Sequence, residues 1–354
     1  MLSFPTTRVL EGTMERILRR QLRMYLAAAG AALLFGSDAP ALALDHVKIG
    51  TLLTSGGTPQ YIAIEKGYFA AEGIDAELVP FDAGQPVAVA AVAGAIDFGA
   101  AGFSSALYTL AAQGELRIIG GGTYDRANFP AAGIFASNAA YAAGLTSLKD
   151  LAGHSVGLTQ VGSTYHYALA IVAQKYGVDM AKIRTLPLQS FANVASAVSG
   201  GQADAGVLIA GAAMPLMQHG NVKLLAWVGE ETPWQVTLMW TTPKMANEHK
   251  DLVERFLRAM RKGSRASYDA FVGPGDVRKD GPTAPEVVAI TQKYVKLTAE
   301  QIEATVGYAD PDLRIDMKDI QRQLDWYHSQ GMLKESVKAS DIIDSRYAVA
   351  LPGN

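Results

Sequence analysis

Residues 46–81 read HVKIGTLLTSGGTPQYIAIEKGYFAAEGIDAELVPF, and this stretch decides the fold of the chain. Residues 46–53 form an alternating and then apolar run, which predicts a β-strand. The glycine pair in 54–57 predicts a turn. Residues 60–68 carry apolar side chains at helical spacing, and residues 75–81 predict a second strand. A strand, a helix and a strand in this order predict a right-handed βαβ unit with parallel strands.

The same alternation continues along the chain with one break. Residues 124–143 have irregular spacing and one short apolar stretch, 132–136, so we expect a connection there. Residues 234–240 predict a strand that returns to the first half, and residues 247–330 are mainly amphipathic helix. Further strands are expected over 97–102, 116–121, 155–159, 184–188, 203–209 and 222–228, and helices over 85–93, 104–113, 163–176, 191–198 and 213–219.

The N-terminus predicts export. Arg16, Arg19, Arg20 and Arg23 precede an apolar run over residues 24–35, and small residues follow at Ala41 and Ala43. A basic segment, a short apolar segment and a small-x-small site are typical of a secretory signal peptide. We expect a signal peptide over 1–43 with cleavage after Ala43, or alternatively after Ala41. The paired arginines leave both the general secretory route and the twin-arginine route open. The predicted location is the periplasm.

Composition excludes several functions. The chain has no Cys, so it has no disulfide, thiolate nucleophile, thiolate metal site or lipidated cysteine. Its formal net charge of -3, without basic runs after residue 43, argues against nucleic acid as a partner. The six histidines lack metal-site spacing, and no G-x-S-x-G segment marks a serine nucleophile. We therefore expect no cofactor, no metal and no catalytic residue, although a carboxylate-based enzyme or a sensor module stays an alternative.

Four segments in order resemble a known family. They are 61–74, with the pattern A-x-x-x-G-[YF]-F-x-x-x-G-[IL]; 92–99, ending in Ile96-Asp97-Phe98-Gly99; 148–157, beginning Leu148-Lys149-Asp150-Leu151-Ala152-Gly153; and 200–205, with Ala203-Asp204-Ala205. The chain resembles the solute-binding proteins of ABC importers for nitrate, sulfonates, aromatic acids and thiamine precursors, the NMT1/THI5-like family. His154 departs from the family pattern, which has Lys or Arg there.

The resemblance implies an α/β fold of the type II periplasmic-binding class, in which two lobes close around one solute. Each lobe is then a mostly parallel sheet flanked by helices, with a helical C-terminal region on the first lobe. The expected first lobe is 44–126 with 232–354, and the expected second lobe is 127–231. The crossovers fall near 123–130 and 229–233. The implied partners are a small-molecule solute and a membrane permease, and a monomer is expected. Two enzyme relatives of this fold, a desulfinase with a cysteine nucleophile and a thiamine-pyrimidine synthase with a cysteine-rich iron motif, depend on cysteine, which is absent here.

Two aspartates in the motifs, Asp97 and Asp204, follow glycine-containing turns that lead into strands. Side chains at such positions commonly accept backbone hydrogen bonds. We expect structural roles for both, not ligand contact. His166, between Tyr165 and Tyr167, is the one histidine near an expected site, and a packed or surface position is favoured for it over a catalytic one.

The candidate binding residues lie where strands end and helices begin. Ligands collect at the carboxyl ends of parallel strands, where helix N-termini present free N–H groups. Aromatic rings nearby suit a planar solute, and Arg126 can clamp a carboxylate or pair with an acidic neighbour such as Asp125. An aromatic carboxylate is favoured, with a pyrimidine precursor or an alkanesulfonate as alternatives. The candidates are Ser55, Gly56, Thr58, Gly102, Phe103, Ser104, Tyr124, Arg126, Gly162, Ser163, Thr164, Tyr165, Phe191 and Trp234.

Overall fold

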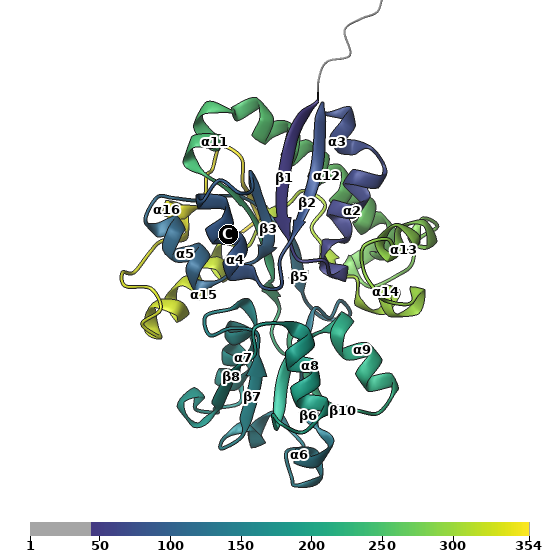
Figure 1. Ribbon diagram of the computed structural model, residues 1–354, viewed down its shortest axis with the longest axis vertical. Helices are drawn as coiled ribbons and strands as arrows, with labels where there is room; N and C mark the ends of the chain where they lie inside the picture. The colour runs from purple at the N-terminus through teal and green to yellow at the C-terminus, as the bar shows by residue number, and fades with distance from the viewer. Residues whose placement is uncertain (1–43, 354) are drawn as a thin grey trace, which may run out of the picture. The chain divides into compact units, whose positions relative to one another are not determined.

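The computed structural model describes residues 44–353, and Leu44–Asn354 form one compact unit. The predicted signal peptide over 1–43 lies outside the described residues. Two five-stranded sheets organise the described chain, one in the upper and one in the lower half of Figure 1. Among the described residues, no helix is long and apolar enough to cross a membrane.

The first sheet has the strand order β2-β1-β3-β12-β4. Strand β1 is parallel to β2 and β3, whereas β12 is antiparallel to both of its neighbours. Valine and isoleucine of β1 are fully buried between the strands and the flanking helices. The strands are β1 (Asp45–Thr51), β2 (Ile74–Pro80), β3 (Phe98–Gly102), β4 (Arg117–Gly121) and β12 (Thr237–Thr241).

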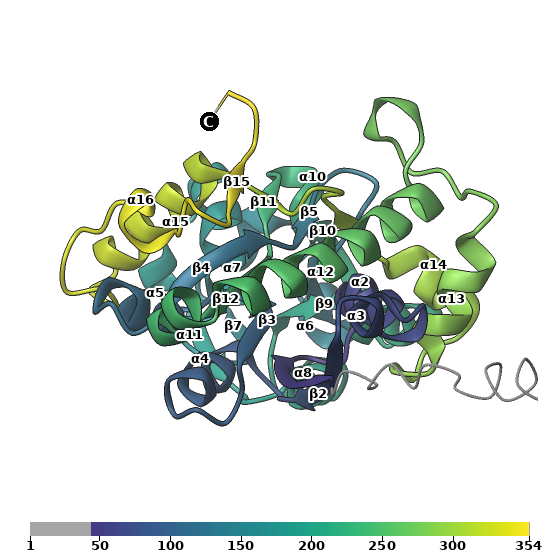
Figure 2. The same cartoon turned by 90° about the horizontal axis from the view of Figure 1, so that it is seen from above.

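Helices cover this first sheet. In Figure 2, α12 runs along the sheet between α11 and α2, while α15 and α16 lie at the side opposite α13 and α14. The long α12 buries one apolar face, which includes Val253, Phe256 and Met260, and exposes its charged face. The helices are α2 (Thr58–Glu65), α3 (Tyr68–Ala71), α4 (Gly84–Val92), α5 (Ser105–Ala112), α11 (Pro243–Glu248), α12 (Lys250–Phe271), α13 (Ala284–Gln292), α14 (Ala299–Thr305), α15 (Met317–Ser329) and α16 (Ala339–Ile342).

The second sheet has the strand order β10-β6-β9-β7-β8. Only β6 runs against its neighbours, since it is antiparallel to both β9 and β10. The strands are β6 (Ala132–Ser137), β7 (Ser155–Leu158), β8 (Arg184–Pro187), β9 (Ala205–Ile209) and β10 (Val222–Trp227). The helices are α6 (Asn138–Ala142), α7 (Thr164–Lys175), α8 (Phe191–Ser199), α9 (Ala210–Gln218) and α10 (Val228–Glu231).

Short strands join the two sheets. Strand β5 (Thr123–Asp125) lies between β11 (Trp234–Gln235) and β13 (Tyr308–Ala309), and both neighbours are antiparallel to it. Strands β5 and β11 belong to the two passages of the chain between the sheets. A final pair, β14 (Arg314–Ile315) and β15 (Val349–Ala350), lies near the C-terminus. The chain therefore crosses between the lobes through two hydrogen-bonded segments.

The expectation of an α/β fold with mostly parallel sheets is confirmed, and most predicted elements lie within a few residues of the observed ones. The prediction that residues 124–143 are only a connection is wrong, because Ala132–Ser137 forms β6 at the interior of the second sheet. Every residue of β6 is buried. Strands buried on both faces lack the apolar-polar alternation by which a strand is recognised in a sequence.

Asp97 and Asp204 have the same structural role in the two lobes. The Asp97 carboxylate accepts the backbone N–H of Lys48 at 2.8 Å, and Asp204 accepts both the N–H and the hydroxyl of Ser155 at 2.8 and 2.7 Å. Asp97 thus binds the middle of the neighbouring parallel strand β1, and Asp204 binds the start of the neighbouring parallel strand β7. The structural interpretation of both residues is confirmed, although the partner is the adjacent strand and not the turn itself.

Candidate ligand-binding cleft

The carboxyl ends of strands from both lobes face each other across a cleft. The loop after β3 meets the loop after β7, where Ser104 and Ser163 form an isolated β-bridge. The N–H of Ser105 donates to the Gly162 carbonyl at 2.8 Å, and the Gln85 amide donates to the Val161 carbonyl at 2.8 Å. These contacts hold the lobes together on one side of the cleft.

Gly102 and Thr164 set how closely the lobes approach. A Cβ atom at Gly102 would lie 2.4 Å from the Thr164 hydroxyl oxygen, which is closer than non-bonded atoms tolerate. The Thr164 hydroxyl in turn donates to the carbonyl of Phe103 in the first lobe. Glycine is therefore needed at residue 102 because a side chain there would occupy the place of Thr164.

Two small cavities lie beside this contact, with volumes of about 20 and 40 Å³. Each has room for about one water molecule and is far below the several hundred Å³ typical of ligand pockets. An organic solute can enter only when the lobes move apart or the rings at the cavity turn. The smaller is lined by Leu52, Ala83, Gly84, Gln85, Gly102, Phe103, Ser104, Thr159, Ser163, Thr164, Tyr165 and Phe191. The larger is lined by Thr51, Leu52, Thr54, Gly56, Gly57, Gln60, Ala100, Ala101, Gly102, Tyr165, Phe191 and Thr237.

Tyr165 and Phe191 border both cavities from the second lobe. Their rings meet edge to face, with centroids 5.2 Å apart and an interplanar angle of 81°. Both side chains are half-buried, and the Tyr165 hydroxyl has no hydrogen-bond partner among the described residues. Burial raises the pKa of this hydroxyl, so it stays protonated and can donate to a solute.

Gln60 on α2 contributes a polar group that the sequence analysis missed. Its amide nitrogen donates to the Ala100 carbonyl at 3.3 Å, so the amide oxygen of Gln60 points away from that carbonyl. That oxygen is buried and has no hydrogen-bond partner among the described residues. A buried acceptor without a partner costs free energy. Gln60 lines the larger cleft cavity and also a cavity of about 20 Å³ beside Met260 and Leu313, so a donor in either cavity could satisfy this oxygen. The only signal in the sequence was the position of Gln60 just after the loop that follows β1.

Within residues 44–353, no charged side chain lines either cavity. Positive potential comes instead from helix N-termini, whose first N–H groups lack partners within the helix. Helix α4 begins at the smaller cavity, and its N-cap residue Ala83 has no side chain that could accept those N–H groups. Helices α5 and α7 are capped by Ser104 and Ser163, whose hydroxyls accept from Leu107 and His166.

Three predicted residues of the first loop have different environments. Gly56 lines the larger cavity. The Ser55 hydroxyl donates to the Thr305 carbonyl at 3.0 Å, and the Thr58 hydroxyl donates to the Ser55 carbonyl at 2.8 Å. Thr58 is fully buried. The hydroxyls of Ser55 and Thr58 thus join segments of the first lobe, and neither residue lines a cleft cavity.

Three other predicted residues lie at the crossovers and line neither cavity. Arg126 pairs with Asp276 at 3.3 Å, and its guanidinium lies over the Tyr308 ring at 4.5 Å. The acidic partner of Arg126 is therefore Asp276 and not its neighbour Asp125. The Tyr124 hydroxyl donates to the Arg314 carbonyl at 2.8 Å. Trp234 is buried against Phe103, with ring centroids 5.8 Å apart.

Asp125 holds the two crossovers together. Its carboxylate accepts the N–H groups of Ala131 and Ala132 at 3.0 and 3.1 Å and the indole N–H of Trp234 at 3.2 Å. Burial is complete and raises the pKa of Asp125 to about 7, although the N–H of Gly229 and the other donors act in the opposite direction. Gly229 is needed as glycine, because a Cβ there would lie 2.2 Å from this carboxylate.

His166 supports the cleft loop from behind. The N–H of Gly162 donates to its Nδ1 at 3.1 Å, and its ring meets Trp326 at 5.2 Å. An imidazole nitrogen can accept only when it is unprotonated, and burial lowers the pKa of His166 to about 4. The packed interpretation is confirmed.

We expect stability to depend on pH through His166. The folded-state pKa lies below the unfolded value of about 6.5, so this stabilisation is present at neutral pH and is lost as the pH falls toward 4. In His166→Asn, the amide oxygen can still accept from Gly162 but does not titrate. Between about pH 7.5 and pH 5, wild type should lose about 2 kcal/mol more free energy of unfolding than this variant. Urea unfolding at both pH values measures the difference, and equal losses would contradict the prediction.

Among the described residues, no group of three or more His, Asp or Glu side chains is placed to hold a metal ion. The arrangement as a whole is that of a type II periplasmic binding protein, because two sheets with facing strand ends enclose an interlobe site. The chain belongs to the NMT1/THI5-like family, whose family model matches residues 55–270, more than half of the sequence. No curated protein sequence is a match.

Solved structures share the fold at low sequence identity. The alkanesulfonate-binding protein SsuA from Xanthomonas axonopodis pv. citri, bound to MOPS, has a TM-score of 0.69 and 20% identity over 86% of this chain and 99% of that one. The nitrate-binding protein NrtA from Synechocystis PCC 6803 has a TM-score of 0.66 and 14% identity over 86% and 87%. A mutant of the enzyme DszB in complex with biphenyl-2-sulfinic acid has a TM-score of 0.57 and 14% identity over 86% of this chain and 96% of that one. Similar structures are thus mostly binding proteins.

Proposed function

We propose that this protein is the periplasmic solute-binding component of an ABC importer and takes a small organic molecule with a planar part into the interlobe cleft. The observation that carries the proposal is the site itself: Gly102 and Gln60 from one lobe and Tyr165 and Phe191 from the other border the same cavity. A solute held there contacts both lobes at once, so its binding free energy stabilises the closed state.

The proposed lobes are 44–126 with 232–354 and 127–231, exported by the signal peptide and acting as a monomer. Closure creates the combined surface that a membrane permease recognises. The proposed contacts are the predicted residues that border the cavities: Gly56, Gly102, Phe103, Ser104, Ser163, Thr164, Tyr165 and Phe191, with Gln60 added.

An aromatic carboxylate stays the first candidate solute. The Tyr165–Phe191 pair suits a ring, and the uncapped N-terminus of α4 suits an oxyanion. Arg126 does not favour a carboxylate, because its guanidinium is paired with Asp276 and lines neither cavity. An alkanesulfonate has the same oxyanion chemistry without the ring.

A thermal-shift screen of the purified protein against aromatic carboxylates, alkanesulfonates, pyrimidines and nitrate tests the function. A solute at about 100 times its dissociation constant adds about 2.7 kcal/mol of stability. For a chain of this size, that corresponds to a shift of several degrees, at about 2–4 °C per kcal/mol. Recovery of the compound unchanged supports binding without catalysis. Recovery of an altered compound supports an enzyme instead, and no shift from any class argues against an importer component.

Gln60 favours a second candidate, a pyrimidine with an exocyclic amino group. Its unpaired oxygen is buried in the first lobe and accepts only from a solute that carries an N–H or O–H group. Gln60→Met removes this acceptor at similar volume. We expect the variant to bind an aminopyrimidine about tenfold more weakly, the loss of about one hydrogen bond. Calorimetry measures the affinity, and an unchanged affinity for a solute with amino groups would exclude this contact.

A further inference from the structure

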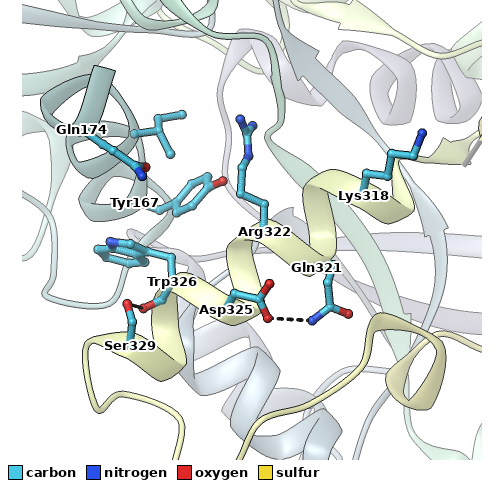
Figure 3. A pocket seen from close by; sticks show the side chains of 9 residues that line it. Tyr167, Gln174, Lys318, Gln321, Arg322, Asp325, Trp326 and Ser329 are labelled. Carbon is cyan, nitrogen blue, oxygen red and sulfur yellow. Dashed lines mark hydrogen bonds between the residues drawn. The ribbon is translucent and has the colours of Figure 1, made fainter. Parts of the chain in front are cut away.

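A larger cavity lies outside the cleft, between helices α7 and α15. Its volume is about 550 Å³, within the range typical of small-molecule sites. Three of its lining residues belong to α7 and six to α15. Figure 3 shows the Tyr167 ring between Gln174 and Arg322, with the Trp326 indole beside it. We call this cavity the α7–α15 groove.

The two walls of the groove belong to different lobes. Helix α7 belongs to the second lobe and begins at the cleft, where Thr164 and Tyr165 line the smaller cavity. Helix α15 is fixed to the first lobe, because the amide of Gln323 lies within hydrogen-bonding distance of both the Tyr108 hydroxyl and the Gln235 carbonyl. Rotation of one lobe against the other therefore changes the width of the groove.

The walls meet at the first turn of α7, where the Tyr167 ring packs on Trp326 with centroids 5.5 Å apart and the Tyr167 hydroxyl donates to Asp319 at 3.4 Å. There the Tyr327 hydroxyl donates to the Ser163 carbonyl at 3.1 Å, and Trp326 packs on His166. Farther along α7, Ile171 and Gln174 face the groove. Beyond the Tyr167 contact, a molecule in the groove would touch Ile171 and Gln174 of α7 as well as α15, and would so hold one angle between the lobes.

The lining favours a planar aromatic molecule. Tyr167, Ile171 and Trp326 supply apolar surface. Arg322 is held in place by Asp319 and by the Pro233 carbonyl at 3.2 Å, so its guanidinium offers a fixed flat face on which a ring can stack. Among the described residues, the Trp326 indole N–H and the Gln174 amide have no hydrogen-bond partner.

One cation at the rim is available to an anion. Arg322 is ion-paired with Asp319, and the Asp325 carboxylate accepts from the Gln321 amide at 2.9 Å, which leaves Lys318 as the cation that an anion can pair with. The Asp319 carboxylate lies behind Arg322 and is buried, with additional donors in the Gln235 N–H and the Gln323 amide. Lys318 is exposed, and within the described part of the chain it reaches only the carbonyl of Gly353, at 2.8 Å.

We propose that the α7–α15 groove is a second ligand site, which takes a planar aromatic anion and thereby shifts the equilibrium between open and closed lobes. By thermodynamic reciprocity, the cleft solute and the groove ligand then change each other's affinity by the same factor. This coupling rests on the proposed solute binding in the cleft, whereas binding in the groove does not.

The fluorescent probe anilinonaphthalene sulfonate, an aromatic anion, tests the site. Gln174→Trp places a large ring at the rim without breaking a hydrogen bond of the side chain, and should weaken probe binding by at least about tenfold, equivalent to about 1.4 kcal/mol. Gln292→Trp on α13, an exposed glutamine far from the groove (Figure 2), is the control and should leave binding unchanged. It loses the 3.4 Å hydrogen bond from its amide to the Leu297 carbonyl, so urea unfolding is used to check that this variant is folded. Equal affinity of the probe for wild type and Gln174→Trp would overturn the proposal.

Two further arms test charge and position. Lys318→Gln should weaken binding of the anionic probe by about threefold to tenfold and leave binding of its uncharged analogue phenylnaphthylamine unchanged. The control Lys250→Gln should change the binding of neither dye. An uncharged analogue that binds wild type as tightly as the sulfonate would overturn the assignment to an anion. Tyr165→Ala opens the cleft cavity and should leave probe binding intact; loss of the probe in this variant, with retention in Gln174→Trp, would place the dye in the cleft and overturn the groove site.

Discussion

Asp125→Ala should lower the free energy of unfolding by about 3–5 kcal/mol, the range reached when a buried hydrogen-bonded network is broken. The variant leaves the N–H groups of Ala131 and Ala132 and the Trp234 indole without their acceptor in a fully buried position. Each buried donor left unpaired costs about 1–3 kcal/mol. Urea unfolding followed by circular dichroism measures the loss.

Two further variants give this prediction its controls. Asp269→Ala removes an exposed aspartate on α12 with no side-chain hydrogen bond among the described residues, and should change stability by less than about 0.5 kcal/mol. Asp125→Asn keeps one acceptor oxygen and should lose less than the alanine variant. Equal stability of Asp125→Ala and Asp269→Ala would show that this carboxylate does not hold the crossovers together.

Asp125 also predicts a pH dependence opposite to that of His166. Its folded-state pKa of about 7 lies above the usual value of 3.8, so its contribution to stability is greatest below 3.8 and is lost as the pH rises through 7. Asp125→Asn does not titrate, so wild type should gain stability relative to this variant as the pH falls from about 7.5 to 5. The same unfolding measurements report this gain.

Gly102→Ala should weaken solute binding by about 10- to 100-fold, because the closed state that binds the solute becomes less populated. The added Cβ would lie 2.4 Å from the Thr164 hydroxyl oxygen, which belongs to the other lobe. The three heavy atoms nearest to the added methyl group all belong to Thr164, so the methyl group does not clash within the first lobe. Small-angle X-ray scattering should therefore show a larger radius of gyration for the variant, even without solute.

The double variant Gly102→Ala with Thr164→Ala provides the test of cause. Removing the Thr164 hydroxyl leaves its Cβ at 3.4 Å from the new methyl group, an ordinary contact distance. We expect the double variant to recover most of the affinity and the compact scattering profile. Thr164→Ala alone loses the hydrogen bond to the Phe103 carbonyl and should weaken closure only slightly. Weak binding by the double variant would show that the steric contact is not what limits closure.

The fold could be predicted largely because local patterns recur. Neighbouring residues alone indicate the apolar runs of β1, β2 and β7. They also indicate the serines that cap α5 and α7. Strand β6 could not be recognised in this way. Its residues are buried on both faces, so they show no alternation. Its direction follows from the path of the chain. Strands β6 and β12 are the first strands of their sheets after a crossover, so each runs away from the cleft while its neighbours run toward it.

The candidate site was predicted in outline. Sequence reasoning placed the glycine and hydroxyl segments at strand ends, and Gly102, Ser104, Ser163 and Thr164 do meet across the cleft. It did not find Gln60, because the isolation of its oxygen depends on the position of the Ala100 carbonyl in another strand.

The sequence by itself determined the alternation of strands and helices, the two halves and the family, since these depend on periodicity and short motifs. Only the tertiary structure decided which polar groups are free. Arg126 is paired with Asp276, 150 positions away along the chain, and Thr58 with Thr291, 233 positions away, so neither partner was visible locally. Hydrogen bonds form between groups that folding brings within about 3 Å, and separation along the chain does not limit them.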